Sequence, residues 1–182
     1  MMERAPMYAD TTIVFKGPKF DDVKKAHPAG VCASFTFDWI KKVLAKKVCN
    51  ESTYESSGRL RKLVRRQNKY ENSEGDLTVL AKSYGLEILQ GSAIRADDIK
   101  PAIFKPDSSC YYISMQLQQG PQHAIGFDRS TNLFCDANFG IMKLNTRTID
   151  SIILECWDAL AELNDGTKSV FWVYPVKLMP AK

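Results

Sequence analysis

Apolar residues recur every three or four positions in four segments of the chain, with charged residues between them. In the first segment, Phe35, Trp39 and Val43 fall on one side and lysines cover the other. This spacing is that of an amphipathic helix. Residues that cap helices, such as Asp76, and glycines that end them, such as Gly85, mark boundaries. The pattern therefore predicts helices over residues 34–48, 55–68, 76–84 and 147–163.

The second half of the chain contains short apolar segments bounded by turn residues, which is typical of strands. A polar stretch over residues 128–132 separates two of them and predicts a hairpin. Helices come first, then an antiparallel meander into which one helix is inserted, an order typical of an α+β fold. The expected strands cover residues 111–117, 123–127, 133–136 and 170–174, the last one closed by Pro175. By the same patterns, Trp39, Trp157 and Trp172 are expected in the core.

One domain accounts for most of the chain. The 182 residues are 45% hydrophobic, enough to bury a core without disulfides or metals. Residues 1–27 show no helical or strand periodicity, so we predict an irregular N-terminal segment. We predict that residues 28–182 form a single domain.

Basic residues exceed acidic ones by a small margin, with a formal net charge of +4. The simplest interpretation of the arginine-rich helix is a solvated basic face. The alternative is a docking surface for an anionic membrane or an acidic partner. We expect no nucleic-acid partner, because the helix lacks interleaved aromatic residues and the net charge is low. The arginines of this helix are Arg59, Arg61, Arg65 and Arg66.

The five cysteines form no CxxC pair, so we expect no metal site. Their number is odd, which indicates a protein that works in a reducing compartment. We also expect no cofactor. Four of them are interpreted as small buried hydrophobic residues. The N-terminus lacks the pattern of a cleavable signal peptide, and no apolar run is long enough to span a membrane. The four cysteines are Cys49, Cys110, Cys135 and Cys156.

Cys32 differs from the other cysteines because it lies at the start of the first predicted helix, just after Gly30. The unpaired N–H groups and the dipole of a helix N-terminus favour a thiolate there. His123 begins one predicted strand, and Asp136 ends the next, 13 residues later (136 − 123). Adjacent strands lie about 4.8 Å apart, so Asp136 can hold the far nitrogen of the imidazole. The three residues supply a nucleophile, a base and a group that orients the base.

These residues resemble those of papain-like cysteine hydrolases, and within them the YopT/AvrPphB-type effector peptidases. The resemblance covers roughly residues 28–177. It implies a papain-like α+β fold, in which an N-terminal helical part carrying the cysteine packs on a C-terminal antiparallel sheet carrying the histidine and the aspartate. The matching residues are Gly30-Val31-Cys32 followed by Trp39, His123-Ala124-Ile125-Gly126 and Asp136-x-Asn138-Phe139-Gly140.

The resemblance implies a bacterial effector cysteine protease that acts through a Cys-His-Asp triad and a thioester acyl-enzyme. Such proteins are secreted by a specialised secretion system and cut a host protein in the host cytoplasm. A related glutamine deamidase effector, OspI, is similar in fold and triad. The gap of 91 residues between Cys32 and His123 (123 − 32) is nearer to the deamidase type. Deamidation therefore stays open as the alternative, although the motifs favour the protease.

The oxyanion hole is the point where this sequence departs from the papain-like pattern. Papain-like enzymes commonly place a glutamine a few residues before the nucleophile, but residues 26–31 contain no side-chain amide. The backbone N–H of Cys32 can supply one donor. The second donor is His27, Gln122 or another backbone amide, and the sequence does not distinguish them.

Two further functions use the same three residues differently. In a transferase, an amine or another nucleophile replaces water at the thioester. In a non-catalytic binding module, the triad would be incidental, and the presence of all three groups argues against it. His123 and Asp136 also have a structural interpretation, as a hydrogen-bonded core residue and a turn residue.

Overall fold

The computed structural model describes residues 11–15, 30–47, 57–95, 104, 108–119, 122–164 and 166–180. Its helices are α2 (Cys32–Leu44), α4 (Ser57–Glu71), α5 (Leu77–Ser83) and α6 (Ile149–Leu163). Its strands are β1 (Thr11–Phe15), β2 (Leu86–Ile88), β3 (Ser92–Ile94), β4 (Cys110–Leu117), β5 (Gln122–Asp128), β6 (Leu133–Asp136), β7 (Gly140–Leu144) and β8 (Lys168–Leu178).

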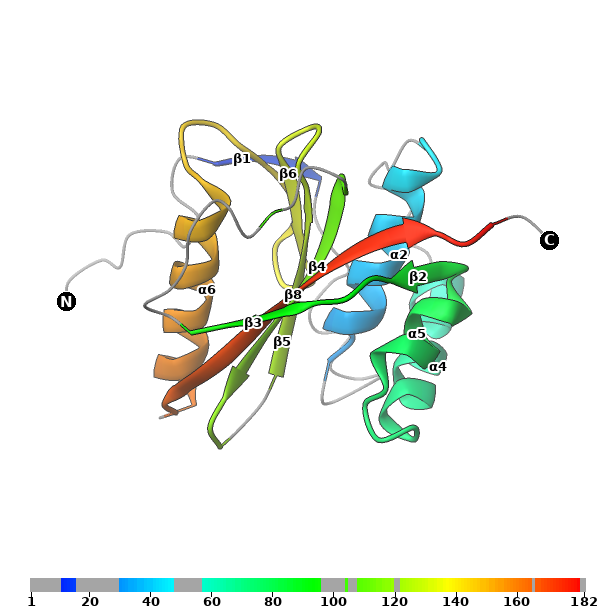
Figure 1. Ribbon diagram of the computed structural model, residues 1–182, viewed down its shortest axis with the longest axis horizontal. Coiled ribbons are helices and arrows are strands. Elements are labelled where there is room, and N and C mark those ends of the chain that lie inside the picture. Colours follow the sequence, from blue (N-terminus) through cyan, green and yellow to red (C-terminus); the bar gives the residue numbers. More distant parts are fainter. Residues whose placement is uncertain are drawn as a thin grey trace.

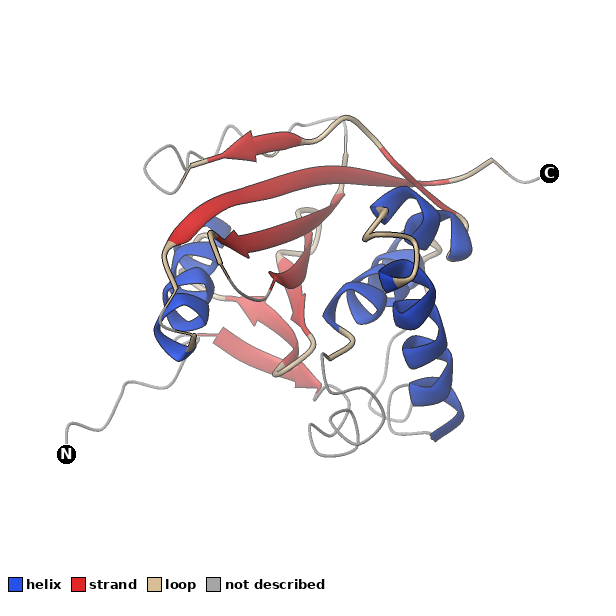
Figure 2. Ribbon diagram, turned by 90° about the horizontal axis from the view of Figure 1, so that it is seen from below, coloured by secondary structure: helices blue, strands red, loops and turns tan. Residues whose placement is uncertain are grey.

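The described strands form one antiparallel sheet with helices on both faces. The strand order is β1-β7-β6-β5-β4-β8-β2, and β3 also pairs with β8. Helix α6 covers one face, and α2, α4 and α5 lie on the other (Figures 1 and 2). The α+β arrangement expected from the sequence is confirmed.

Each of the four predicted helices is present, with shifted ends. Asp76 caps α5 as expected, because its carboxylate accepts the N–H of Thr78 at 2.7 Å. Helix α2 begins at Cys32 itself, two residues earlier than predicted, and ends at Leu44. Among the described helices, none has the length and apolar character needed to cross a membrane.

Residues on the central strands alternate between two cores. On β4, Tyr112 faces the cluster built around α2, whereas Tyr111 and Ile113 face the cluster built around α6. Both faces of the central strands are therefore buried, and β4 carries apolar residues on both sides. Trp39 and Trp157 are fully buried as predicted, one in each core.

Three expectations about the chain are wrong in this structure. Residues 11–15 were predicted to be irregular, but they form β1, which pairs with β7 through Thr11 and Leu144. The last strand does not stop at Pro175 but continues to Leu178. Trp172, expected in the core, is 36% exposed and stacks on Tyr174.

Pro175 is tolerated because of where its nitrogen points. Its carbonyl accepts the N–H of Leu89 at 2.9 Å, so its main-chain groups face β2 and β3 and not β4. It lies between the residues of β8 that pair with β3 and those that pair with β2. The missing N–H of proline therefore removes no bond between β4 and β8.

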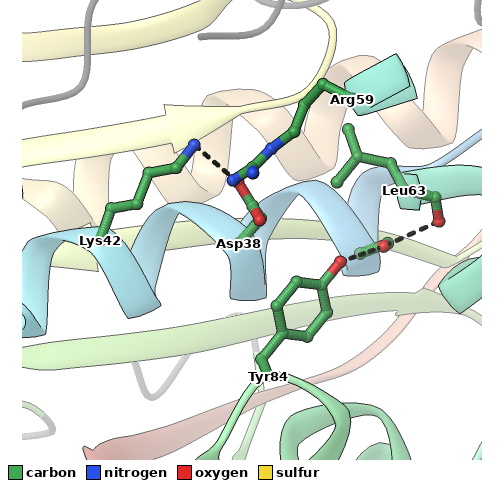
Figure 3. A network of polar contacts seen from close by, with 6 residues as sticks. Asp38, Lys42, Arg59, Leu63 and Tyr84 are labelled. Atoms are coloured by element: carbon green, nitrogen blue, oxygen red, sulfur yellow. Dashed lines mark hydrogen bonds and ion pairs between the residues drawn. The ribbon is translucent and has the colours of Figure 1, made fainter. Parts of the chain in front are cut away.

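A buried polar network fixes α2 against its neighbours (Figure 3). Asp38 on α2 pairs with Lys42 at 2.8 Å and also with Arg59 of α4. The hydroxyl of Ser34 donates to the carbonyl of Leu63 at 2.9 Å and lies 2.5 Å from the hydroxyl of Tyr84. Because buried polar groups must find such partners, these contacts determine how the first turn of α2 sits.

Candidate active site

Cys32 is the first residue of α2, and the turn before it leaves the helix start uncapped by a side chain. Gly30 adopts a φ of +88°, a conformation that favours glycine. Val31 occupies the N-cap position but offers no side-chain hydrogen bond. The first N–H groups of the helix therefore need partners from elsewhere, and the thiol of Cys32 lies at the positive end of the helix dipole.

His123 and Asp136 are brought together by the register of β5 and β6. Ile125 pairs with Asp136, so His123 lies two residues along β5 on the same face. The Nε2 atom of His123 lies 3.0 Å from Oδ2 of Asp136. The predicted approach of this carboxylate to the imidazole is therefore present, and Nδ1 is the ring nitrogen left to serve another group.

Charge and burial act on His123 in opposite directions. Burial by itself lowers the His123 pKa, because it penalises the charged imidazolium. The Asp136 carboxylate, by its charge and its hydrogen bond, raises the pKa, and side-chain hydrogen bonds with Cys156 and Cys32 raise it further. The net result is a His123 pKa well above its ordinary value of 6.5, which favours the imidazolium form.

Cys32 and His123 meet at one cavity of about 240 Å³. By strand alternation, His123 belongs to the face of the sheet that α6 covers, whereas α2 packs on the other face. Both residues nevertheless line this cavity, and Cys32 is among the groups that raise the His123 pKa. Asp136 lies behind His123, fully buried. The structure thus brings Cys32, His123 and Asp136 together.

Cys32 also affects the pKa of two tyrosines that line the cavity. Burial, and next the charge that Cys32 carries as a thiolate, raises the pKa of Tyr70 and raises that of Tyr112 strongly. Both phenols therefore keep their protons at neutral pH. Tyr70 comes from α4 and Tyr112 from β4, so the cavity has walls from both the helical part and the sheet.

The candidate donors of the oxyanion hole have different outcomes. The N–H of Cys32 lies in the first turn of α2, where no helical partner exists for it. Gln122 lines the cavity and is exposed at the start of β5. His27, like Cys49, lies outside the described residues, so its candidacy stays a prediction.

Cys156 is a member of the site that the sequence did not reveal. It is buried as predicted, but its thiol also donates to Oδ2 of Asp136 at 3.5 Å. The ligand atoms of His123, Asp136 and Cys156 lie within 4.8 Å of one another, close enough for a metal ion to be held. The hydrogen bonds to Asp136 account for the same approach without a metal. Nothing in the pattern of α6 marks Cys156, because a thiol on an apolar face is ordinary.

Gln67 is the second residue that the sequence left unnoticed. It lines the cavity from α4 and is only 5% exposed. Leu60, Leu63 and Val64 precede it at helical spacing and face the core. An amide in the next position of that apolar stripe is the signal that could have found it.

Comparisons with known proteins bear on the fold. No protein-family model matches the chain, and no curated protein matches its sequence. Among solved structures, the chain is similar to the crystal structure of the Pseudomonas avirulence protein AvrPphB, with a TM-score of 0.57 and 13% identity. The match covers 86% of this chain and 95% of that chain. This protein therefore has the papain-like α+β fold expected from its sequence, with the cysteine on the helical part and the histidine and aspartate on the antiparallel sheet.

Proposed function

We propose that this protein is a cysteine hydrolase that acts on carboxamide groups of proteins. The observation that carries the proposal is the contact between His123 and Asp136, 3.0 Å long, behind a cavity that Cys32 also lines. A thiol at a helix N-terminus beside an imidazolium is the arrangement that generates a reactive thiolate. The likeness to AvrPphB supports the same class of reaction at the level of the fold.

The proposed reaction proceeds through a thioester. The Cys32 thiolate attacks the carbonyl carbon, and His123 protonates the leaving nitrogen. His123 then takes a proton from water, whose oxygen attacks the thioester carbonyl, so that a carboxylic acid forms and the S–C bond breaks to release the Cys32 thiolate. Asp136 holds the imidazole in one orientation and stabilises its positive charge.

The substrate we propose is a peptide bond of a host protein, which makes the enzyme an effector thiol protease. The residues that resemble the YopT/AvrPphB-type peptidases support this, and so does the likeness to an avirulence protein. Delivery by a bacterial secretion system into the host cytoplasm belongs to the same proposal. Deamidation of a protein glutamine, as in the OspI type, is the alternative, because the same three groups serve both reactions.

The test is a comparison of host-cell lysates treated with the wild type or with Cys32→Ala. We expect new peptide N-termini that depend on Cys32, measured by proteomics. Cys32→Ala and His123→Ala should each lower the activity on the order of 10³-fold or more, while Asp136→Ala acts more mildly. Cys110→Ala, which removes a buried thiol outside the cavity, is the matched control.

Other outcomes of this experiment redirect the proposal. Conversion of glutamine to glutamate without new N-termini would identify a deamidase. New covalent adducts on lysate proteins would identify a transferase. If wild type and Cys32→Ala gave the same peptides, the protein would not be a hydrolase of the proteins in that lysate.

The proposal also includes a partner other than the substrate, which binds the exposed basic face of α4. Arg59 contacts Asp38, and the guanidinium of Arg66 lies 3.9 Å from the centre of the Tyr84 ring. These two arginines therefore point toward the core. We propose that the remaining basic side chains meet an anionic membrane or an acidic protein. They are Arg61, Lys62, Arg65 and Lys69, all exposed.

A further inference from the structure

The first turn of α2 contains a side-chain amide that comes from another helix. Phe35 makes the first helical hydrogen bond, to the carbonyl of Val31, so the three N–H groups before it lack helical partners. Oε1 of Gln67 accepts the N–H of Ser34, the last of these three, at 3.1 Å. All N–H groups of the first turn point toward the helix N-terminus. The side-chain amide of Gln67 therefore lies beside the N-terminal end of α2, toward which the N–H of Cys32 points.

The hydrogen bonds of Gln67 fix which end of its amide is which. Because Ser34 donates to the oxygen, the nitrogen is directed elsewhere, and Nε2 donates to Oε1 of Glu71 at 3.1 Å. An amide nitrogen carries two N–H groups. Only the bond to Glu71 engages it among the residues that the structure describes, and Gln67 lines the same cavity as Cys32.

We propose that Gln67 is a catalytic residue that supplies the second donor of the oxyanion hole, beside the backbone N–H of Cys32. The assignment rests on the proposed function, because it requires an acyl-transfer reaction at Cys32. The sequence offers no side-chain amide just before the nucleophile. In this proposal, a glutamine from α4 supplies that donor.

The position of Gln67 suits this role better than that of Gln122. His123 must protonate the leaving group, so the oxyanion projects away from the imidazole. Gln122 precedes His123 on β5 and so belongs to the wall that carries the base. Gln67 belongs to the wall formed by α4, is buried, and is held by Ser34 and Glu71. Donors held rigidly before the reaction are the effective ones.

Two reactions of the Cys32 thiolate distinguish an oxyanion donor from a structural residue. Acetylation by p-nitrophenyl acetate forms an S–C bond, passes through a tetrahedral oxyanion and expels p-nitrophenolate. Alkylation by iodoacetamide forms an S–C bond as iodide leaves, without an oxyanion. The ratio of the two rate constants, each corrected with Cys32→Ala, cancels any change in the thiolate itself.

We expect Gln67→Ala and Gln67→Glu to lower this ratio by about 10²-fold. Gln67→Glu is the sharper variant, because it keeps an oxygen to accept the N–H of Ser34 but loses the donor. Asn68→Asp adds the same charge at the next, exposed position of α4 and is the matched control. Its ratio should equal that of the wild type. Thermal unfolding of each variant establishes that it is folded at the assay temperature.

Several results would overturn the assignment. Equal losses in acetylation and alkylation would mean that Gln67 acts on the thiol and not on the oxyanion. An unchanged ratio in both Gln67 variants would exclude it as a donor, and a ratio lowered in Gln122→Ala instead would give the role to Gln122. If the wild type showed no acetylation beyond that of Cys32→Ala, the proposed hydrolase itself would fail, and the assignment with it.

Discussion

Asp136 is the side chain on which the geometry of the candidate site depends most. Its Oδ1 accepts the N–H of Asn138 at 2.8 Å, and its Oδ2 is shared by His123 and the thiol of Cys156. Three donors, one from strand β5, one from the turn after β6 and one from helix α6, thus hold one carboxylate in a nearly dry environment. A carboxylate held in this way fixes the ring orientation of His123 and favours its protonated form.

Asp136→Asn should lower the His123 pKa, because the negative charge of Asp136 is the first of the causes that raise it. The stability that the ion pair contributes is fully present below the unfolded pKa, near 6.5. It is lost as the pH rises through the raised folded pKa. Titration of the imidazole protons by NMR measures the change, and the chain has only two histidines to assign.

Asp150→Asn is the control for this titration, because it removes a carboxylate of α6 that does not contribute to the shift of the His123 pKa. Its His123 signal should titrate as in the wild type. A midpoint that stayed in place in Asp136→Asn would mean that the carboxylate does not govern the protonation of His123.

At the scale of elements, a glycine sets how closely α2 approaches the sheet. A Cβ added at Gly126 of β5 would lie 2.8 Å from Sγ of Cys135 and 3.0 Å from the ring of Trp39. Trp39 lies on α2, two turns after Cys32. The absence of a side chain at Gly126 therefore lets α2 settle onto β5, and this contact helps to bring Cys32 to His123.

Gly126→Ala should destabilise the protein by about 1–3 kcal/mol, because the added methyl overpacks a filled core. The free energy of unfolding in urea measures this. Gly58→Ala is the matched control, since a Cβ there meets nothing within 4 Å and alanine suits helix α4 better than glycine. That control should be neutral or up to about 1 kcal/mol more stable. Equal effects of the two substitutions would show that α2 is free to move away from β5.

At the scale of the whole molecule, α4 lies between the cavity of the candidate site and an exposed basic surface. Its inner side supplies Gln67 and Tyr70 to the cavity, and Leu63 to the core. Its outer side carries the exposed basic residues, of which Arg61 and Arg65 are one turn apart and share a face. A partner bound to the basic face would therefore sit next to one wall of the candidate site without filling it.

Replacing both Arg61 and Arg65 with glutamate should weaken binding to vesicles rich in phosphatidylserine by about 30-fold or more. Each basic side chain near such a surface contributes about 1 kcal/mol, and binding should also fall with added salt. Lys143→Glu with Lys177→Glu makes the same charge change at exposed positions of the sheet. Equal losses in the two double variants, or no binding by the wild type, would leave α4 as a solvated basic face. Co-sedimentation measures the bound fraction.

The local pattern of the chain was sufficient to predict the helices, the central strands and the pairing of His123 with Asp136. Periodicity fixed which side of each helix is buried, and β6 runs from Leu133 to Asp136 as predicted. His123 and Asp136 could be paired from sequence because a short turn joins their strands. A hairpin of that kind leaves little choice of register.

Tertiary structure alone decided the features that join distant parts of the chain. Strand β1 exists because β7 offers it a partner 133 residues away, between Thr11 and Leu144, and a local pattern cannot encode that pairing. Gln67 and Cys156 look like unremarkable positions of α4 and α6 until packing places one at the start of α2 and the other under Asp136. Side-chain periodicity reports which face of an element is buried. What that face meets depends on how the elements pack, and this packing assembles the candidate site.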